Sequence, residues 1–126
     1  MIVDASAAIA LAFGEPHAAW LQSVMGRHAT EPWGIAWTNI AEVEIQYAKR
    51  RTRSSVQELL ARLRIEPLAD TFEISRLVGD ARIRFPINLG DCFAYAHAKV
   101  RNEPLLTLDK DFLKTDLPRV LHPDAA

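Results

Sequence analysis

The sequence predicts an α/β fold, with a parallel sheet covered by helices on both faces. Three observations lead to this prediction. Short apolar segments alternate along the chain with longer segments of helical periodicity, which is the pattern of parallel strands joined by helices. The first apolar segment, MIVD, shows no polar–apolar alternation, as expected of a buried strand. The 126 residues, 49% of them hydrophobic, suit one globular domain.

The first half of the chain contains three predicted strands and four predicted helices. Ser6 is placed to cap the first helix, and Gly14 is placed to end it. Asn39 is expected to cap the third helix, and Ser54 or Ser55 the fourth. The predicted strands are 1–4, 34–38 and 65–68, and the predicted helices are 6–14, 15–25, 39–51 and 54–63.

Two longer helices and two strands are predicted in the second half. Asp70 is expected to cap the fifth helix, because Glu73 three residues later completes a capping box. The sixth helix is expected to begin near Gly90. The helices are 70–85 and 90–101, the strands are 104–108 and 119–122, the latter at an edge, and a helical turn covers 109–115.

Charge and composition exclude several classes of protein. The 15 Lys and Arg nearly balance the 16 Asp and Glu, so the chain is not a strongly basic nucleic-acid binder. No apolar run approaches the ~20 residues that span a bilayer, and residues 1–13 lack a basic leader, so a cytoplasmic protein is expected. Cys92, the single cysteine, excludes an internal disulfide and a cysteine-based zinc site, and suits a small buried apolar position.

Acidic residues follow the predicted strands or begin the helices beside them. Asp4 ends the first strand, Glu42 lies one turn past the second, Asp91 opens a helix, and Asp109 and Asp111 follow the strand PLLTL. In open parallel sheets, ligands bind beyond the carboxyl ends of the strands. The sequence therefore predicts a cluster of carboxylates at one edge of the sheet.

A cluster of carboxylates needs a counter-charge, because neighbouring carboxylates repel each other. Asp and Glu oxygens suit Mg²⁺ or Mn²⁺, which accept phosphate oxygens and activate water for attack on a phosphate. Each acid also has a structural interpretation: Asp4, Asp91 and Asp109 could stabilise helix starts, and Glu42 could form a capping box with Asn39. Glu44, which falls within an apolar stripe, could be a buried acid paired with an arginine.

Four segments resemble the PIN-domain nucleases, and more narrowly the VapC toxins of bacterial toxin–antitoxin pairs. They are MIVDASA, TNIAEVE, INLGDCFAYAHAK and LLTLDKDFLKTDL. The resemblance implies a three-layer α/β/α sandwich over residues 1–126, with a central parallel sheet. It implies a Mg²⁺- or Mn²⁺-dependent endoribonuclease that acts on tRNA or another structured RNA as the toxin of a type II pair. It also implies inhibition by a VapB-type antitoxin. A homodimer is expected as well, because the alanine-rich first helices could leave an apolar groove that a second copy or a partner helix fills.

The family's motifs carry over to particular positions of this sequence. They imply catalytic roles for Asp4, Glu42, Asp91 and Asp109, with Asp4, Asp91 and Asp109 as metal ligands and Asp111 as the alternative to Asp109. Hydroxyls that orient the carboxylates are implied at Ser6 and Thr107. The family's basic stretch before the LGD motif is shorter here, ARIRFP, so a substrate contact at that point is in question.

Other readings stay open at this point. The chain could be a PIN nuclease for RNA processing without a toxin role, or a non-catalytic interaction module whose acids are caps. Phosphoryl transfer through Asp4 is disfavoured, because that chemistry usually needs a second aspartate at position 6, which is Ser6. The histidines show no metal-ligand spacing and suit surface or packing roles. A basic run could contact RNA phosphates or form a solvated helix end, and consists of Lys49, Arg50, Arg51 and Arg53.

Overall fold

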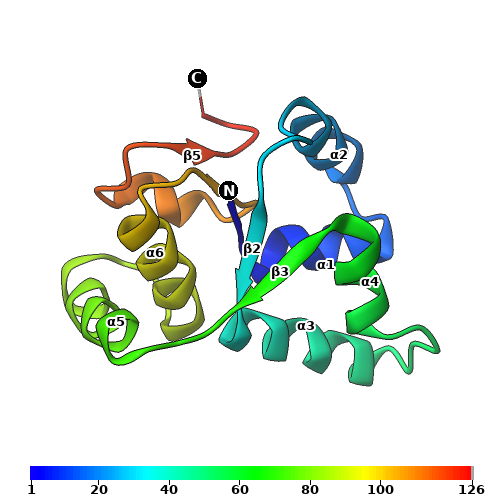
Figure 1. Cartoon of the computed structure of the whole chain (residues 1–126), viewed down its shortest axis with the longest axis horizontal. Coiled ribbons are helices and arrows are strands. Elements are labelled where there is room, and N and C mark those ends of the chain that lie inside the picture. Colours follow the sequence, from blue (N-terminus) through cyan, green and yellow to red (C-terminus); the bar gives the residue numbers. More distant parts are fainter. Residues whose placement is uncertain (126) are drawn as a thin grey trace.

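The computed structural model describes residues 1–125 and has a five-stranded parallel sheet at its centre (Figure 1). The strand order is β3-β2-β1-β4-β5, so the first strand of the sequence is the middle strand of the sheet. This confirms the predicted α/β class with a parallel sheet, and it confirms that the last strand lies at an edge. The strands are β1 Ile2–Val3, β2 Trp33–Ala36, β3 Ile65–Leu68, β4 Leu105–Leu106 and β5 Val120–Leu121.

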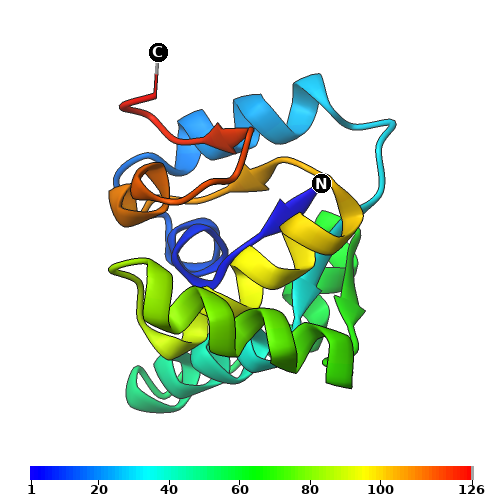
Figure 2. The same cartoon turned by 90° about the vertical axis from the view of Figure 1, so that its left-hand side faces the viewer.

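Helices cover both faces of the sheet, which gives the three layers that the resemblance implied. One face is covered by α5 and α6, which lie toward the viewer in Figure 2, and the other by α1 to α4. None of the helices in the described residues is long and apolar enough to cross a membrane. The helices are α1 Ala5–Phe13, α2 Ala18–Arg27, α3 Trp37–Lys49, α4 Val56–Leu63, α5 Phe72–Arg84 and α6 Leu89–Arg101, with a 3₁₀ helix η1 at Lys110–Lys114.

The central strands are buried on both faces. Ile2 pairs in register with Leu105, and both pack against α5 and α6. Val3 pairs with Leu106, and both pack on the opposite face against α1 to α4. Because successive side chains of a strand point to opposite faces, each strand needs apolar residues at every position. This explains why MIVD lacks polar–apolar alternation.

Asp4, rather than Ser6, caps α1. The Asp4 backbone is extended, and its Oδ1 accepts the backbone N–H of Ala7 at 3.0 Å. Ser6 lies inside the first turn, where its hydroxyl donates back to Asp4 Oδ1 at 2.8 Å. Gly14 ends the helix as predicted, with a φ of 59° in the left-handed region that glycine adopts at little cost. The carboxylate that follows β1 therefore has a structural role as well as a candidate functional one.

Asn39 and Asp70 do not cap helices, contrary to the prediction. The strand β2 ends earlier than predicted, α3 begins at Trp37, and Asn39 lies inside the helix. Thr71 caps α5, one residue after the predicted position. Asp70 instead accepts a hydrogen bond from the hydroxyl of Thr38 at 2.9 Å, which ties the end of β3 to the start of α3.

His97 is a fully buried histidine on α6, in one of the packing roles expected for the histidines. Its Nε2 lies 2.8 Å from Asp70 Oδ1, and its Nδ1 lies 2.8 Å from the guanidinium of Arg101. A guanidinium only donates, so Nδ1 accepts and the proton is on Nε2. Burial lowers the pKa of His97; Asp70 opposes this shift, and the charge of Arg101 adds to it.

We expect this histidine to make the fold sensitive to acid. A histidine whose pKa is lower in the folded than in the unfolded chain stabilises the fold fully above about pH 6.5, and this contribution falls as pH drops below that value. His97→Gln should therefore show a flatter loss of melting temperature between pH 7 and pH 5 than the wild type. His28→Gln, at a half-exposed histidine on the surface, is the control. Parallel pH profiles for the wild type and His97→Gln would contradict this assignment.

Candidate active site

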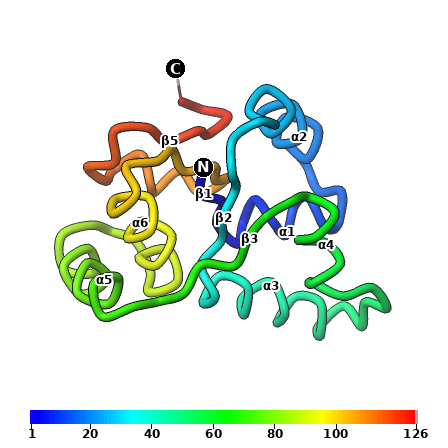
Figure 3. The backbone as a smooth tube through the Cα atoms, viewed as in Figure 1, coloured from blue at the N-terminus to red at the C-terminus, as the bar shows by residue number. Residues whose placement is uncertain are grey.

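The candidate site lies at the carboxyl ends of β1 and β4. The strand order reverses between these two strands, because the chain passes from β1 toward β2 and β3 on one side and from β4 to β5 on the other (Figure 3). Such a reversal leaves a crevice that parallel sheets commonly use to bind ligands. Asp4 follows β1 and Asp109 follows β4, so the fold brings both acids to this crevice.

Two hydroxyl groups hold the carboxylate of Asp4. Thr107 donates to Asp4 Oδ2 at 2.6 Å, and Ser6 donates to Oδ1 at 2.8 Å. The same hydroxyls accept backbone N–H groups from the segment after β4: Ser6 Oγ from Leu108 at 3.0 Å, and Thr107 Oγ1 from Asp109 at 2.9 Å. Ser6 and Thr107 therefore join the ends of the two central strands and orient Asp4.

Asp4 is buried, with 1% of its surface exposed. Burial raises its pKa to about 6, although the hydrogen bonds from Thr107, Ala7 and Ser6 act in the opposite direction. The charge of Asp109 raises the pKa of Asp4 further. The hydroxyl and amide donors thus offset only part of the cost of burying this charge.

Asp91 and Asp109 lie near each other in the crevice. Asn88 caps α6 by accepting the backbone N–H of Asp91 at 2.8 Å, which places Asp91 in the first helical turn. The pKa of Asp91 is raised to about 8, first by burial, then by a hydrogen bond with Asp109 and by the charges of Asp109, Asp4 and Glu42. The charges of the other three predicted acids therefore all act on Asp91 at this edge of the sheet.

Asn39 and Gly90 set the position of Glu42. The Asn39 amide Nδ2 donates to Glu42 Oε1 at 2.7 Å and to the carbonyl oxygen of Gly90 at 3.0 Å. A Cβ on Gly90 would lie 2.6 Å from both carboxylate oxygens of Glu42, so only glycine permits this approach. The side-chain oxygen of Asn39 is buried and has no partner in the described residues. The amide is therefore oriented entirely by its two donated hydrogen bonds.

The acids line an open cavity of about 320 Å³. Its walls combine the carboxylates of Glu42, Asp91 and Asp109 with the apolar side chains of Ile9 and Ile45. The residues that complete the wall are Ala5, Ser6, Gln46 and Asn88. A cavity lined by both carboxylates and apolar side chains can hold a hydrated cation together with an organic anion.

The donor set matches a hard divalent cation in its chemistry, although the carboxylates are not gathered at one point. Within residues 1–125, no three Asp, Glu, His or Cys side chains are close enough together to bind one metal ion as they stand. Asp91 and Asp109 line the same cavity, and the charge of Asp109 helps to raise the pKa of Asp91. A divalent cation held between these carboxylates would offset their repulsion, so the donor set fits a metal.

The other predicted site residues lie outside this cavity. Asp111 forms an ion pair with Lys114 at 3.3 Å. Arg50 binds Glu15 at 2.8 Å and stacks over the ring of Phe13 at 3.9 Å. Glu44 is exposed rather than buried against an arginine, so that interpretation was wrong. The predicted basic run lies at the end of α3 and beyond it, and consists of Lys49, Arg50, Arg51 and Arg53. None of these residues lines this cavity.

Sequence reasoning missed the roles of Asn39, Asn88 and Gly90. The three-residue spacing of Asn39 and Glu42 was interpreted as a capping box, whereas the same spacing within a helix lets the two side chains bond directly. Asn88 stands three residues before Asp91, which is the spacing of a helix cap and could have been recognised. Nothing in the sequence near Gly90 indicates how closely Glu42 approaches it.

Comparison with known proteins finds relatives over nearly the whole chain. The family model of the PIN domain matches residues 1–117. Ribonuclease VapC36 of Mycobacterium tuberculosis is 33% identical over 93% of this chain and 91% of its own length. Ribonuclease VapC of Mycolicibacterium smegmatis is 32% identical over 95% of this chain and 99% of its own length.

Solved structures share the fold at lower identity. VapBC2 from Rickettsia felis, bound to a DNA fragment from its promoter, has a TM-score of 0.79 at 16% identity, covering 96% of each chain. VapC20 of Mycobacterium tuberculosis, a toxin that cleaves the sarcin–ricin loop, has a TM-score of 0.71 at 15% identity, covering 89% of this chain and 92% of that one. With the family match and the two full-length relatives above, these findings identify the chain as a member of the PIN-domain family and, within it, of the VapC proteins.

Proposed function

We propose that this chain is a metal-dependent endoribonuclease that cleaves tRNA or another structured RNA. One observation carries the proposal: Glu42, Asp91 and Asp109 line one cavity at the switch point of the sheet, and the charges of Asp109, Asp4 and Glu42 all raise the pKa of Asp91. Carboxylates from distant parts of the chain therefore make the ionised form of Asp91 costly here, and a bound cation would offset that cost.

The residues of the chain have distinct parts in this proposal. Asp91 and Asp109 would hold a Mg²⁺ or Mn²⁺ ion, with Asp4 oriented beside them by Ser6 and Thr107. When bound, such an ion lowers the pKa of a water molecule and offsets charge on the phosphate. Glu42 is held through Oε1 by Asn39, and its Oε2 would accept a proton from the attacking water.

Cleavage assays with purified tRNA and with total RNA test this function. We expect new RNA ends in Mg²⁺ or Mn²⁺, none in EDTA, and none with Asp4→Asn in any of these buffers. Sequencing of the ends identifies the RNA and the cleaved bond. Equal cleavage by the wild type and Asp4→Asn would overturn the proposed site. The absence of cleavage in any metal would favour the non-catalytic interaction module.

A paired substitution distinguishes the two candidates for the fourth acid. Asp109 contacts Asp91, whereas Asp111 pairs with Lys114. We expect Asp109→Asn to reduce the cleavage rate by more than about 100-fold and Asp111→Asn to change it by less than about threefold. Initial rates at saturating Mg²⁺ measure both effects, and a larger loss in Asp111→Asn would reverse the assignment.

Similar proteins of known structure support the toxin role. Several solved structures with this fold are toxin–antitoxin complexes, among them one from Klebsiella pneumoniae with a TM-score of 0.74. We propose that a VapB-type antitoxin binds this chain in the cytoplasm and blocks the acidic cavity, and that the chain forms a homodimer. A small reading frame beside the gene whose product relieves growth arrest would support the toxin role. RNA cleavage without growth arrest would favour RNA processing instead.

A further inference from the structure

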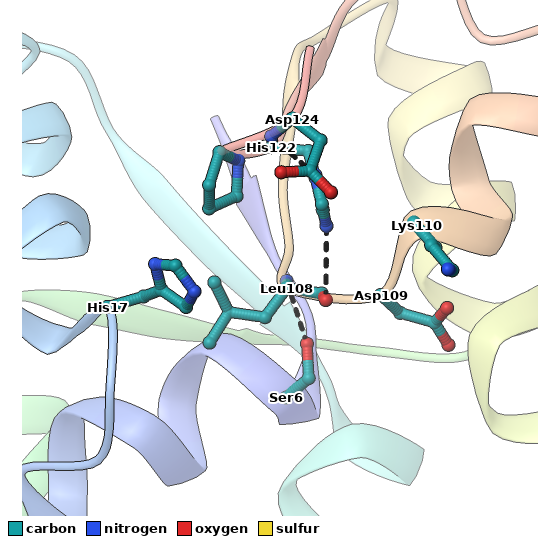
Figure 4. A pocket seen from close by; sticks show the side chains of 8 residues that line it. Ser6, His17, Leu108, Asp109, Lys110, His122 and Asp124 are labelled. Carbon is teal, nitrogen blue, oxygen red and sulfur yellow. Dashed lines mark hydrogen bonds between the residues drawn. The ribbon is translucent and has the colours of Figure 1, made fainter.

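A second cavity adjoins the acidic one and is not used by the proposed chemistry. It has a volume of about 430 Å³, within the range of small-molecule sites, and it shares Ser6 and Asp109 with the acidic cavity. We name it the His17 pocket. Figure 4 shows His17 at one end and Asp109 with Lys110 at the other. The full lining is Ser6, His17, Leu108, Asp109, Lys110, His122, Pro123 and Asp124.

Part of the wall is structural and already has its hydrogen-bond partners. His122 Nε2 lies 3.1 Å from the carbonyl oxygen of Leu108, and its Nδ1 accepts the backbone N–H of Asp124 at 2.9 Å. Ser6 Oγ is engaged with Asp4 and with the N–H of Leu108. These contacts fix the shape of the pocket between the ends of β4 and β5.

Three polar side chains of the pocket have no such partner. Within the described part of the chain, the imidazole of His17, the ammonium of Lys110 and the carboxylate of Asp124 make no hydrogen bond or ion pair. His17 also has a φ of 75°, in the left-handed region, and does not cap α2 with its side chain. Strained backbone of this kind is concentrated at functional sites.

We propose that the His17 pocket binds a nucleotide of the substrate RNA that adjoins the scissile phosphate. This rests on the proposed function, because the scissile phosphate is placed at Asp91 and Asp109 in the neighbouring cavity. The imidazole of His17 and the apolar faces of Leu108 and Pro123 offer surfaces on which an unstacked base can pack. Lys110 offers a cation for the phosphate, and Asp124 offers an acceptor for the N–H or O–H groups of the nucleotide.

Cleavage kinetics on oligoribonucleotides with one abasic position test the proposal. Once the cleaved bond is mapped, the base on either side of it is removed in turn. We expect removal of one of these bases to raise the KM of the wild type about tenfold at nearly constant kcat. His17→Asn, which tolerates a positive φ, should raise the KM for intact RNA by a similar factor. For His17→Asn, the KM for the abasic RNA should then be no higher than the KM for the intact RNA.

Matched variants separate the pocket from general charge effects. Lys110→Gln should raise KM and lower the salt dependence of binding by about one phosphate contact. Lys114→Gln and His28→Ala, which lie outside the pocket, should behave like the wild type. The proposal would be overturned if His17→Asn had the KM of the wild type. It would also be overturned if base removal raised the KM of His17→Asn by the same factor as that of the wild type. In either case, wild-type cleavage shows that the proposed function itself stands.

Discussion

Asp91→Asn is expected to abolish RNA cleavage while the fold remains intact. Asp91 contacts Asp109 and lines the acidic cavity together with Glu42. Asparagine keeps the size of the side chain but removes the charge that would attract a cation. Loss of a residue that only orients a metal ligand typically lowers activity or metal affinity about 10- to 100-fold. Because Asp91 would itself hold the metal, we expect the cleavage rate to fall by more than about 100-fold. Initial rates in Mg²⁺ measure this, with Asp80→Asn, an exposed aspartate on α5, as the control.

The same substitution is expected to stabilise the metal-free protein at neutral pH. Burial and nearby carboxylates raise the pKa of Asp91 to about 8. A carboxyl group with a raised pKa in the folded state favours folding at low pH, and this contribution disappears as pH rises from about 4 to about 8. In EDTA at pH 8, Asp91→Asn should be more stable than the wild type by on the order of 1 kcal/mol, because partial exposure reduces the full effect. The difference should vanish near pH 4.

Mg²⁺ provides the control for this reversal of stability. A ligand that binds only the folded state raises the melting temperature, so Mg²⁺ should stabilise the wild type and leave Asp91→Asn almost unchanged. Thermal unfolding in EDTA and in Mg²⁺ measures both proteins side by side. Equal stabilisation of the two proteins by Mg²⁺ would show that the ion binds elsewhere. A wild type more stable than Asp91→Asn in EDTA at pH 8 would show that the carboxylates do not repel one another there.

Gly90→Ala is expected to reduce activity with little change in stability. The new methyl group would lie 2.6 Å from the carboxylate oxygens of Glu42, so this carboxylate must move and give up its bond with Asn39. A lost hydrogen bond costs about 1 kcal/mol, and alanine in a helix gains about as much over glycine. The two effects offset each other in folding but not in function. We expect the cleavage rate to fall about 10- to 100-fold, measured beside the melting temperature.

Gly79→Ala is the matched control for this prediction. Gly79 lies in α5 with open space where a Cβ would be, so alanine there should stabilise the protein by about 1 kcal/mol and leave cleavage unchanged. If Gly90→Ala retained the wild-type rate, the position of Glu42 would not matter for cleavage. If Gly90→Ala instead unfolded the protein, the side chain of Glu42 would not be free to move, and Glu42→Gln would take its place as the test.

Much of the fold could be predicted because its signals are local. The lack of alternation in MIVD indicated a strand covered on both faces, and the structure places Ile2 opposite Leu105 and Val3 opposite Leu106 at the centre of the sheet. Helix starts were less predictable. Asp4 and Ser6 are both good caps, and the structure assigns the cap to Asp4 because its Oδ1 reaches the N–H of Ala7.

The candidate site could be predicted only as a set of acids. The carboxyl ends of parallel strands share one edge, so Asp4 and Asp109 could be placed together from their positions after two strands. The approach of Glu42 to Gly90 could not be predicted, because the two residues lie on different helices, α3 and α6, whose packing sets the distance. The His17 pocket could not be predicted from the sequence either, because His17 and Asp124 come from opposite ends of the chain.

By itself, the sequence determined the α/β class, the set of acids expected at one edge of the sheet, and the kind of ion that carboxylates suit. These follow from hydrophobic periodicity and side-chain chemistry, which act over a few residues. Only the tertiary structure decided that Asp91 and Asp109 touch, that Thr107 holds Asp4, and that a second cavity lies beside them. Packing sets the distances between residues far apart in the chain, and it depends on how the three layers fit together.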